Sequence, residues 1–339
     1  MPHRLSTARR LADLRQIYTG ETASSLRPAT RNGTQHWEPA DRHTVAAILA
    51  HGVDHTRGGA AALLPVPDHV RRAVLADTRD PVQQRLEAAI LRALGRAVLH
   101  RRPEPLRQGP VCSSVRPIAP ATVGLHLRAS ILGPMLAELT VSGLRVVVHR
   151  RHVELLLRAD ESVASVSLAA ISNRQWAAAT HYAHALTGTV WPMGRGHPEP
   201  LHGWPAVDPA KAAYTNPMAA ALLRRLRVLG PTNWLAVGID DDRLTIHLTW
   251  AGGASTTTVA AHLTHPLGGL PAQRFDAYHH ADDISLMAHG PHDEPAVAVV
   301  LCNLDGQAPP PRARTDTTAA WTAFDAALTR PASRTRPAR

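Results

Sequence analysis

The chain has 339 residues, 44% of them hydrophobic and 19% charged, and a formal net charge of +10. This composition supports packed cores and excludes a disordered chain, and the length favours two domains or one large domain with an accessory region. Two cysteines exclude a disulfide framework, and no apolar run reaches the ~18 residues that span a membrane, so we expect a cytoplasmic protein that does not contact a membrane.

Helical periodicity dominates the first hundred residues. Apolar residues recur at helical spacing over 5–18, and Gly20 follows them as a stop signal. The strongest pattern begins at Asp80-Pro81, a cap residue followed by a first-turn proline, and predicts a helix with an apolar stripe over 86–98. The next stretch holds five prolines and is predicted to be a linker, residues 101–121.

Strands and helices are mixed in the middle of the chain. Two of the predicted strands flank Arg150-Arg151, which must form a tight turn. A pair of like charges at such a turn is costly to bury, so these arginines are predicted to be exposed. We expect strands over 123–127, 144–149, 152–158 and 163–170, and helices over 130–142 and 173–187.

The C-terminal part begins with a Pro/Gly-rich stretch over 188–210. It contains Trp191 and Trp204, which we interpret as lids over the core, with exposed docking groups as the alternative. After it we expect a helix over 217–229, strands over 234–239 and 244–250 around an Asp240–Asp242 turn, a helix over 255–264, a hairpin of 284–288 with 297–301, and a helix over 317–328.

These elements predict an α+β fold, with a helical N-terminal region followed by one or two mixed lobes with antiparallel β-hairpins. Helices 130–142 and 217–229 each end at a glycine and precede a hairpin, so a duplicated α-β-β-α unit is one interpretation, and recurrence of a common motif is the other. The corresponding boundaries are a helical region 1–100, a Pro-rich linker 101–121, a first lobe 122–190, a Pro/Gly-rich connection 191–215, a second lobe 216–330 and a disordered basic tail 331–339.

Lysine is almost absent, since Lys211 is the only one among 37 basic residues. Scarce Lys and Phe beside abundant Arg, Ala and Pro are typical of a GC-rich bacterial genome. The shortage also excludes chemistry, because the sequence contains no phosphate-binding loop lysine and no kinase lysine motif. A pyridoxal-phosphate enzyme would have to use Lys211.

Histidines offer the main route to an enzyme. Seven of the 21 lie within 240–305 beside several carboxylates, and this ligand set suits a divalent transition metal. Strand spacing separates two clusters by ~20 Å, so either would need ligands from elsewhere. The alternative is histidine on exposed turns and no cofactor. The candidate ligands are His279, His280, Asp282, His289, His292 and Asp293.

Charge is distributed unevenly along the chain. Residues 1–239 carry a net +13 and residues 240–305 a net −7, a contrast that codon bias over a whole gene does not produce. The helix over 217–229 is expected to bury its leucines and expose its arginines. The predicted nucleic-acid or partner-binding residues are Arg71, Arg72, Arg150, Arg151, Arg224, Arg225 and Arg227.

We therefore expect a non-enzymatic binding or scaffold protein that engages a nucleic-acid backbone or an acidic protein surface through arginine-rich faces. The alternative is a metal-dependent enzyme with a His/Asp site within 240–305. Whether three His, Asp or Glu side chains meet around one point distinguishes the two.

Overall fold

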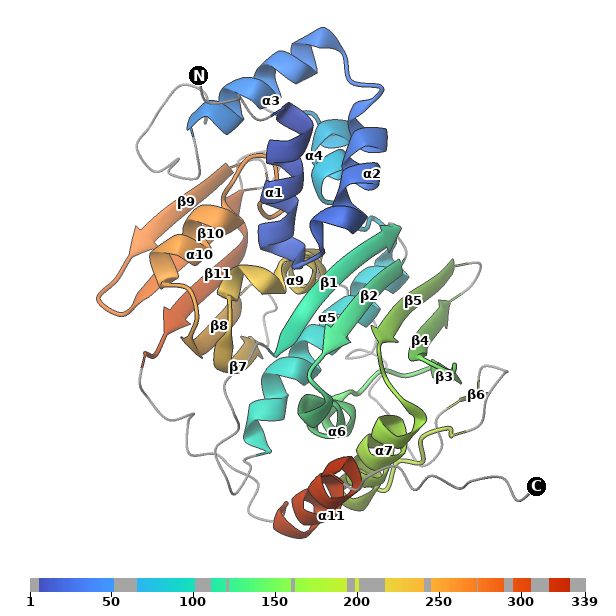
Figure 1. The fold of residues 1–339 in the computed structure, drawn as a ribbon. Helices are drawn as coiled ribbons and strands as arrows, with labels where there is room; N and C mark the ends of the chain where they lie inside the picture. Colours follow the sequence, from blue (N-terminus) through green and yellow to red (C-terminus); the bar gives the residue numbers. More distant parts are fainter. Residues whose placement is uncertain are drawn as a thin grey trace, which may run out of the picture.

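Two β-sheets lie side by side in the computed structural model, and a layer of N-terminal helices lies across one end of both (Figure 1). The chain has the predicted α+β fold, with helices preceding the sheets. The structure describes residues 6–51, 66–100, 111–119, 122–159, 162–193, 199–200, 217–240, 245–272, 274–289, 295–305 and 317–329.

Local capping sets the ends of the N-terminal helices. The Ser6 side chain accepts a hydrogen bond from the Arg9 amide, and Gly20 ends the same helix with a φ of 65°. Asp80 caps the long central helix by accepting from the Val82 and Gln83 amides. These helices are α1 (Thr7–Thr19), α2 (Ala23–Thr34), α3 (Pro39–His51), α4 (Asp68–Val74) and α5 (Pro81–Arg96), and the 3-10 turn η3 (Ala97–Leu99) follows.

The first sheet has the strand order β1-β2-β5-β4-β3-β6. Apolar residues alternate along its strands and form buried rows across it, such as the row of Val115, Leu125, Leu168 and Val153. Its elements are β1 (Cys112–Ala119), β2 (Thr122–Leu127), α6 (Ala129–Glu138), β3 (Leu144–Val148), β4 (His152–Ala159), β5 (Ser162–Ala169), α7 (Asn173–Thr187) and β6 (Glu199–Pro200).

The second sheet has the strand order β7-β8-β11-β10-β9. Ile246, Leu248 and Trp250 alternate with partly exposed polar residues along β8, as the sequence predicted for a half-buried strand. Its elements are α9 (Pro217–Arg224), the 3-10 turn η4 (Leu226–Leu229), β7 (Thr232–Ile239), β8 (Thr245–Gly252), α10 (Thr256–Leu263), β9 (Arg274–His279), β10 (Asp283–His289), β11 (Pro295–Asn303) and α11 (Thr318–Thr329).

The two sheets repeat one topology. The order β1-β2-β5-β4-β3 corresponds to β7-β8-β11-β10-β9, and in each sheet the second and last strands of the unit pair in parallel while the other pairs are antiparallel. A helix precedes, interrupts and follows each set of strands, so α5, α6 and α7 correspond to α9, α10 and α11. In the predicted duplication, α6 was taken as the equivalent of α9, because both helices precede a hairpin. The topology instead makes α5 the equivalent of α9.

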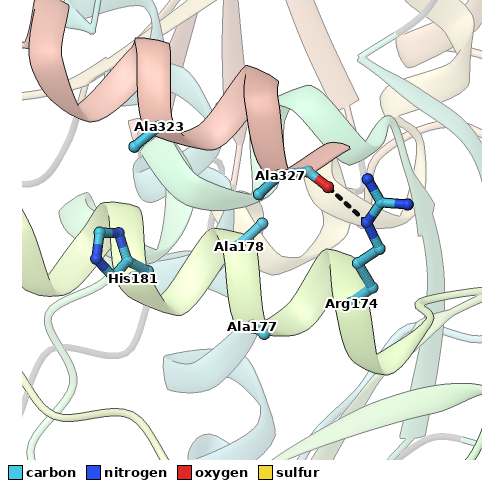
Figure 2. Close-up of a pocket in the computed structure, with 6 residues that line it drawn as sticks. All are labelled: Arg174, Ala177, Ala178, His181, Ala323 and Ala327. Carbon is cyan, nitrogen blue, oxygen red and sulfur yellow. Dashed lines mark hydrogen bonds between the residues drawn. The ribbon is translucent and has the colours of Figure 1, made fainter. Parts of the chain in front are cut away.

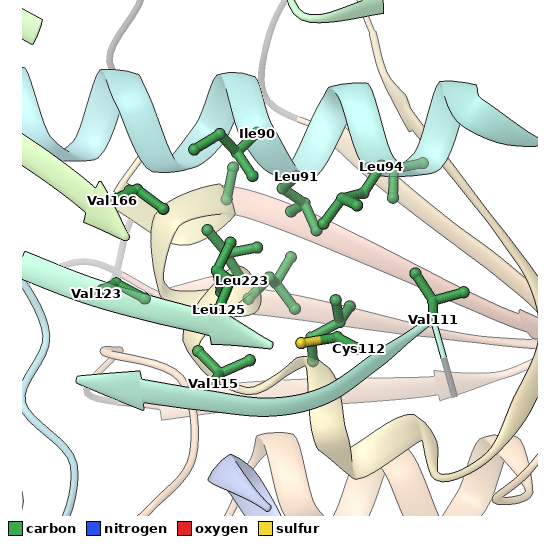
Figure 3. Packing of buried hydrophobic residues seen from close by; sticks show 14 of the residues in the cluster. Ile90, Leu91, Leu94, Val111, Cys112, Val115, Val123, Leu125, Val166 and Leu223 are labelled. Carbon is green, nitrogen blue, oxygen red and sulfur yellow. The ribbon is translucent and has the colours of Figure 1, made fainter. Parts of the chain in front are cut away.

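One core joins the N-terminal helices to both units. Figure 3 shows Ile90, Leu91 and Leu94 of α5 above the inner face of the first sheet, with Leu223 of α9 in the same cluster. The glycine at position 95 lets α5 approach β7 so closely that an added Cβ would lie 2.3 Å from the Val237 amide nitrogen. The boundary at residue 100 between a helical region and the rest of the chain therefore stays a prediction. Because α5 packs on both sheets, we expect it to fold together with them.

Elements outside the sheets pack against two of the edge strands. Helix α5 lies against β7, and η4 lies against β1, where Arg227 donates to the Cys112 carbonyl. The short strand β6 pairs antiparallel with two residues of β3 and forms the other edge of the first sheet.

Several local predictions need correction. The stretch predicted to be a linker contains β1, in which Pro117 is tolerated because β1 is an edge strand. Helix α2 and strand β9 were not predicted, and the helix predicted over 217–229 ends at Arg224 and continues as a 3-10 turn.

Other local predictions are confirmed. Arg150, Arg151 and Asp240 are exposed at their turns, whereas Asp241 and Asp242 lie outside the described residues. Trp191 is buried against Trp176, as expected of a lid over the core, and Trp204 lies outside the described residues. Within the described ranges, no helix is long and apolar enough to cross a membrane.

Candidate functional site

Two of the arginines expected on the surface are buried. Arg224 is 0% exposed and Arg225 is 1% exposed, so the prediction of a solvent-facing arginine stripe on this helix is wrong for both. The physical reason is that α9 packs between the two units, where α5 lies against it. Neither guanidinium group is available to a partner.

Carboxylates within the chain neutralise these two arginines. Arg224 donates two hydrogen bonds to Glu87, at 2.8 and 2.5 Å, and Gln83 donates a third to the same carboxylate. Arg225 donates to both oxygens of Asp77, at 2.6 and 2.8 Å. Burial raises the pKa of Glu87, while Arg224 and Gln83 oppose that shift. This network holds α5 and α9 together.

The remaining predicted arginines are either half-buried or exposed. Arg71 donates to the carbonyls of Gly269, Leu270 and Ala272, so it fastens α4 to the second unit. Arg72 lies 3.6 Å from Asp68, and Arg227 is half-buried beside β1. Only the turn residues Arg150 and Arg151 of the predicted set are exposed.

A basic surface does form, and sequence reasoning did not identify it. On the outer face of the first sheet, opposite the core, lie Arg116 of β1, Arg145 of β3 and Arg158 of β4, and all three are exposed. We call these three residues the basic face. Strand alternation places them there, because Val115, Leu144 and Leu157 beside them point into the core.

The charges of the basic face are only partly balanced. Arg116 lies 3.6 Å from the buried carboxylate of Glu21. Neither Arg145 nor Arg158 has an ion-pair partner among the residues that the structure describes. Glu154 lies on the same face and contacts His149 at 3.3 Å and the Ser165 hydroxyl at 3.1 Å. The outer face of the first sheet is therefore net positive.

The equivalent face of the second sheet differs in charge. Asp276 and Asp283 lie there, together with His289 and His247, and Asp276 contacts His289 at 2.8 Å. Asp240 lies at the end of β7, 3.2 Å from His247. The contrast in net charge along the sequence thus becomes a contrast between two sheet faces of the same topology.

The predicted metal ligands do not form a site in the part of the chain that is described. His279, His280 and Asp282 are exposed near the β9–β10 turn, and His289 lies on β10 beside Asp276. No three His, Cys, Asp or Glu side chains converge as metal ligands among the described residues. His292 and Asp293 lie outside those residues.

A buried line of polar groups resembles a catalytic relay. His100 bridges the Tyr182 hydroxyl, at 3.1 Å, and the Glu138 carboxylate, at 2.7 Å, and Arg96 donates to the same carboxylate. His100 and Tyr182 are buried, and the Tyr182 ring packs so closely on Gly133 that an added Cβ would lie 2.9 Å away. Because these side chains are buried, the hydroxyl is not exposed to a substrate, and we interpret the line as a contact that stabilises the packing of α6 and α7.

This line makes stability depend on pH. Burial raises the pKa of Glu138, but hydrogen bonds from His100 and Arg96 outweigh it and lower that pKa from its usual 4.5 to about 2. A depressed folded-state pKa gives stability that is present above about pH 4.5 and lost as pH falls toward 2. We expect the unfolding free energy of the wild type to fall more steeply over this window than that of Glu138→Gln, measured by urea denaturation. The exposed Glu38→Gln variant should follow the wild type, and parallel curves for Glu138→Gln and wild type would contradict the assignment.

A groove of about 310 Å³ lies between α7 and α11 (Figure 2). Its walls are Ala177, Ala178, Ala323 and Ala327, with Arg174 at one end and His181 at the other. Arg174 donates from Nε to the Ala327 carbonyl near the end of α11, where a cation is favourable. The alanine walls offer no polar group to orient a ligand, and we interpret the groove as a helix–helix seam.

Cys112 is not an activated nucleophile, because burial raises the pKa of its thiol to about 12. The surface that remains as the candidate site is the basic face together with the turn residues Arg150 and Arg151. No protein-family description, no curated protein and no solved structure matches this chain.

Proposed function

We propose that the protein is a non-enzymatic, cytoplasmic binding protein whose basic face contacts the phosphate backbone of a nucleic acid. The observation that carries the proposal is the exposure of Arg116, Arg145 and Arg158 on one sheet face. Arginine guanidinium groups bind phosphate oxygens through two parallel hydrogen bonds, which makes such a surface suited to a nucleic-acid backbone.

The dimensions of the face support contact with more than one phosphate. Four strand steps separate β1 from β3 in the sheet order, which is about 19 Å at the usual ~4.8 Å between strands. The β3–β4 turn extends the surface with Arg150 and Arg151. A backbone that crosses the strands would meet positive charge at both ends of the face.

The same face argues for binding without base recognition. Its exposed apolar side chains are Ile118 and Val163, and among the described residues no phenylalanine, tyrosine or tryptophan lies there, although it carries imidazole rings such as His126 and His152. Base-stacking on a platform of large aromatic rings is therefore not expected, and neither is a strong sequence preference. Affinity should come from phosphate contacts and fall steeply with salt.

The decisive variant removes two arginines without adding negative charge. In Arg145→Gln/Arg158→Gln we expect affinity at low salt to fall about tenfold or more, and the slope of log Kobs against log salt on duplex DNA to fall by about 1.8, since each phosphate contact contributes ~0.9. Fluorescence anisotropy on unrelated duplex and single-stranded DNA and RNA measures both quantities.

The matched control is Arg9→Gln/Arg27→Gln, which removes two exposed arginines from α1 and α2. It should bind like the wild type, and equal weakening by the control would remove the basic face as the site. No binding of the wild type to any of these nucleic acids at low salt would overturn the proposal. Binding to polyglutamate, without binding to any of the nucleic acids, would favour an acidic protein as the partner.

A further inference from the structure

Two histidines flank the arginine turn at the end of the basic face. His149 directly follows β3 and His152 begins β4, and the His149 amide donates a hydrogen bond of 2.9 Å to the His152 carbonyl. Their rings stack, with 4.1 Å between the ring centroids and 16° between the ring planes. Both side chains lie on the outer face of the first sheet, because the neighbouring Val148 and Val153 are buried in the core. The stacked pair therefore shares a surface with the arginines.

The row of imidazoles continues across the sheet. His152 lies opposite Ala169 of β5, and the parallel register of β5 with β2 extends this row to His126. Two strand steps separate β4 from β2, which is about 10 Å at the usual spacing between strands. His126 is exposed and the His149 side chain is 38% exposed, so a ligand in solvent can reach the row.

The charged groups around the stacked pair have opposite effects on its protonation. Arg150 and Arg151 form the exposed turn between the two rings and disfavour further positive charge. Glu154 of β4 lies 3.3 Å from the His149 Nε2 atom and favours it. The part of β5 beside the pair presents uncharged serine and alanine side chains. The next charges along β3 and β4 are the arginines of the basic face.

Without a ligand, the pair resists full protonation. Burial lowers the pKa of His152, the neighbouring His149 lowers it further, and Glu154 opposes both effects. Two imidazolium rings stacked at 4.1 Å would repel each other. A phosphate group beside the rings supplies the opposite charge and accepts N–H hydrogen bonds, which favours the protonated form. Phosphate binding and protonation of the pair therefore strengthen each other.

We propose that His149 and His152 form a proton-linked phosphate contact at the end of the basic face, so that nucleic acid binds more tightly as pH falls. This inference rests on the proposed nucleic-acid binding and adds its regulation. The sign follows from linkage, because a ligand that binds with uptake of protons gains affinity at low pH. For each proton taken up, log Kobs rises by up to about 1 per pH unit over the range in which histidine titrates.

The test compares binding to duplex DNA at about pH 5.5 and about pH 7.5, at one salt concentration, by fluorescence anisotropy. Duplex DNA is a suitable probe, because its phosphodiesters stay ionised and its bases stay paired over this range. The wild type should bind about tenfold more tightly at the lower pH. His149→Gln/His152→Gln should bind like the wild type at the higher pH, and its gain at the lower pH should shrink to about threefold or less.

Two further variants separate this effect from a loss of structure. His36→Gln/His43→Gln removes two exposed imidazoles from the N-terminal helical layer and should keep the wild-type pH dependence. His149→Arg/His152→Arg carries permanent charge at the pair, so its affinity at the higher pH should approach that of the wild type at the lower pH. Circular dichroism should be the same for all four proteins.

The outcomes distinguish this inference from the proposed function. Wild-type binding that is equal at the two pH values would overturn the inference and leave nucleic-acid binding intact. A pH dependence that the glutamine variant keeps in full, or that the arginine variant keeps in full, would also overturn it. Absence of wild-type binding to duplex DNA at both pH values would count against the proposed function, and the inference would be overturned with it.

Discussion

Glu87→Ala is expected to lower the free energy of unfolding by about 3–5 kcal/mol, because it leaves the Arg224 guanidinium buried without its counter-charge. Both side chains of this pair are 0% exposed, and two hydrogen bonds join them. Solvent cannot replace a carboxylate at this depth, so the penalty is not reduced by hydration as it would be at the surface. Urea denaturation followed by circular dichroism measures the loss.

Two comparisons separate this effect from a general loss of packing. The double variant Glu87→Leu/Arg224→Met replaces both charges with apolar groups, and it should be markedly more stable than Glu87→Ala, as expected when a buried pair is removed as a unit. Asp68→Ala breaks the exposed contact with Arg79 and should change stability by no more than about 1 kcal/mol. Equal losses in Glu87→Ala and Asp68→Ala would contradict the role assigned to the buried pair.

The same pair illustrates why the sequence misplaced the arginines of α9. Leu222, Leu223 and Leu226 form an apolar stripe, and a single amphipathic helix with such a stripe normally exposes its other side. Here a second helix, α5, covers that side and supplies Glu87. Local periodicity contains no information on the element 137 residues away that provides the counter-charge.

Elements with strong local signals were predicted well. The Asp80 cap and the glycine stop at Gly20 each lie where a described helix begins or ends. Strand β1 was missed, because prolines near it indicated a linker and only its place at a sheet edge makes Pro117 acceptable. The parallel pairings of β2 with β5 and of β8 with β11 depend on crossovers that no local pattern specifies.

Part of the candidate site could have been predicted from the sequence. Arg145 and Arg158 lie in strands that were predicted, and their alternation with Leu144 and Leu157 places them on the outer face. Arg116 lies in the segment predicted to be a linker. The binding residues were predicted from arginines that are adjacent in sequence. The exposed basic face instead consists of arginines that are separated in sequence and that strand pairing brings onto one face.

Gly95→Ala is expected to destabilise the protein by about 2–3 kcal/mol, although alanine is the better helix former by ~1 kcal/mol. Gly95 lies inside α5, and its added Cβ would lie 2.3 Å from the Val237 amide nitrogen and 2.4 Å from the Val237 Cβ. The obstacle includes strand backbone, so α5 must move away from β7, and the steric cost outweighs the gain in helix propensity. Chemical denaturation measures the difference.

The matched control lies on the strand that α5 contacts. Gly238 of β7 has 3.6 Å to its nearest neighbour, the His247 Cβ, and an alanine there makes an ordinary van der Waals contact. Gly238→Ala should therefore be neutral or slightly stabilising, because it reduces the conformational freedom of the unfolded chain. A Gly95→Ala variant as stable as Gly238→Ala would mean that α5 and β7 are farther apart, and the shared core of the two units would need revision.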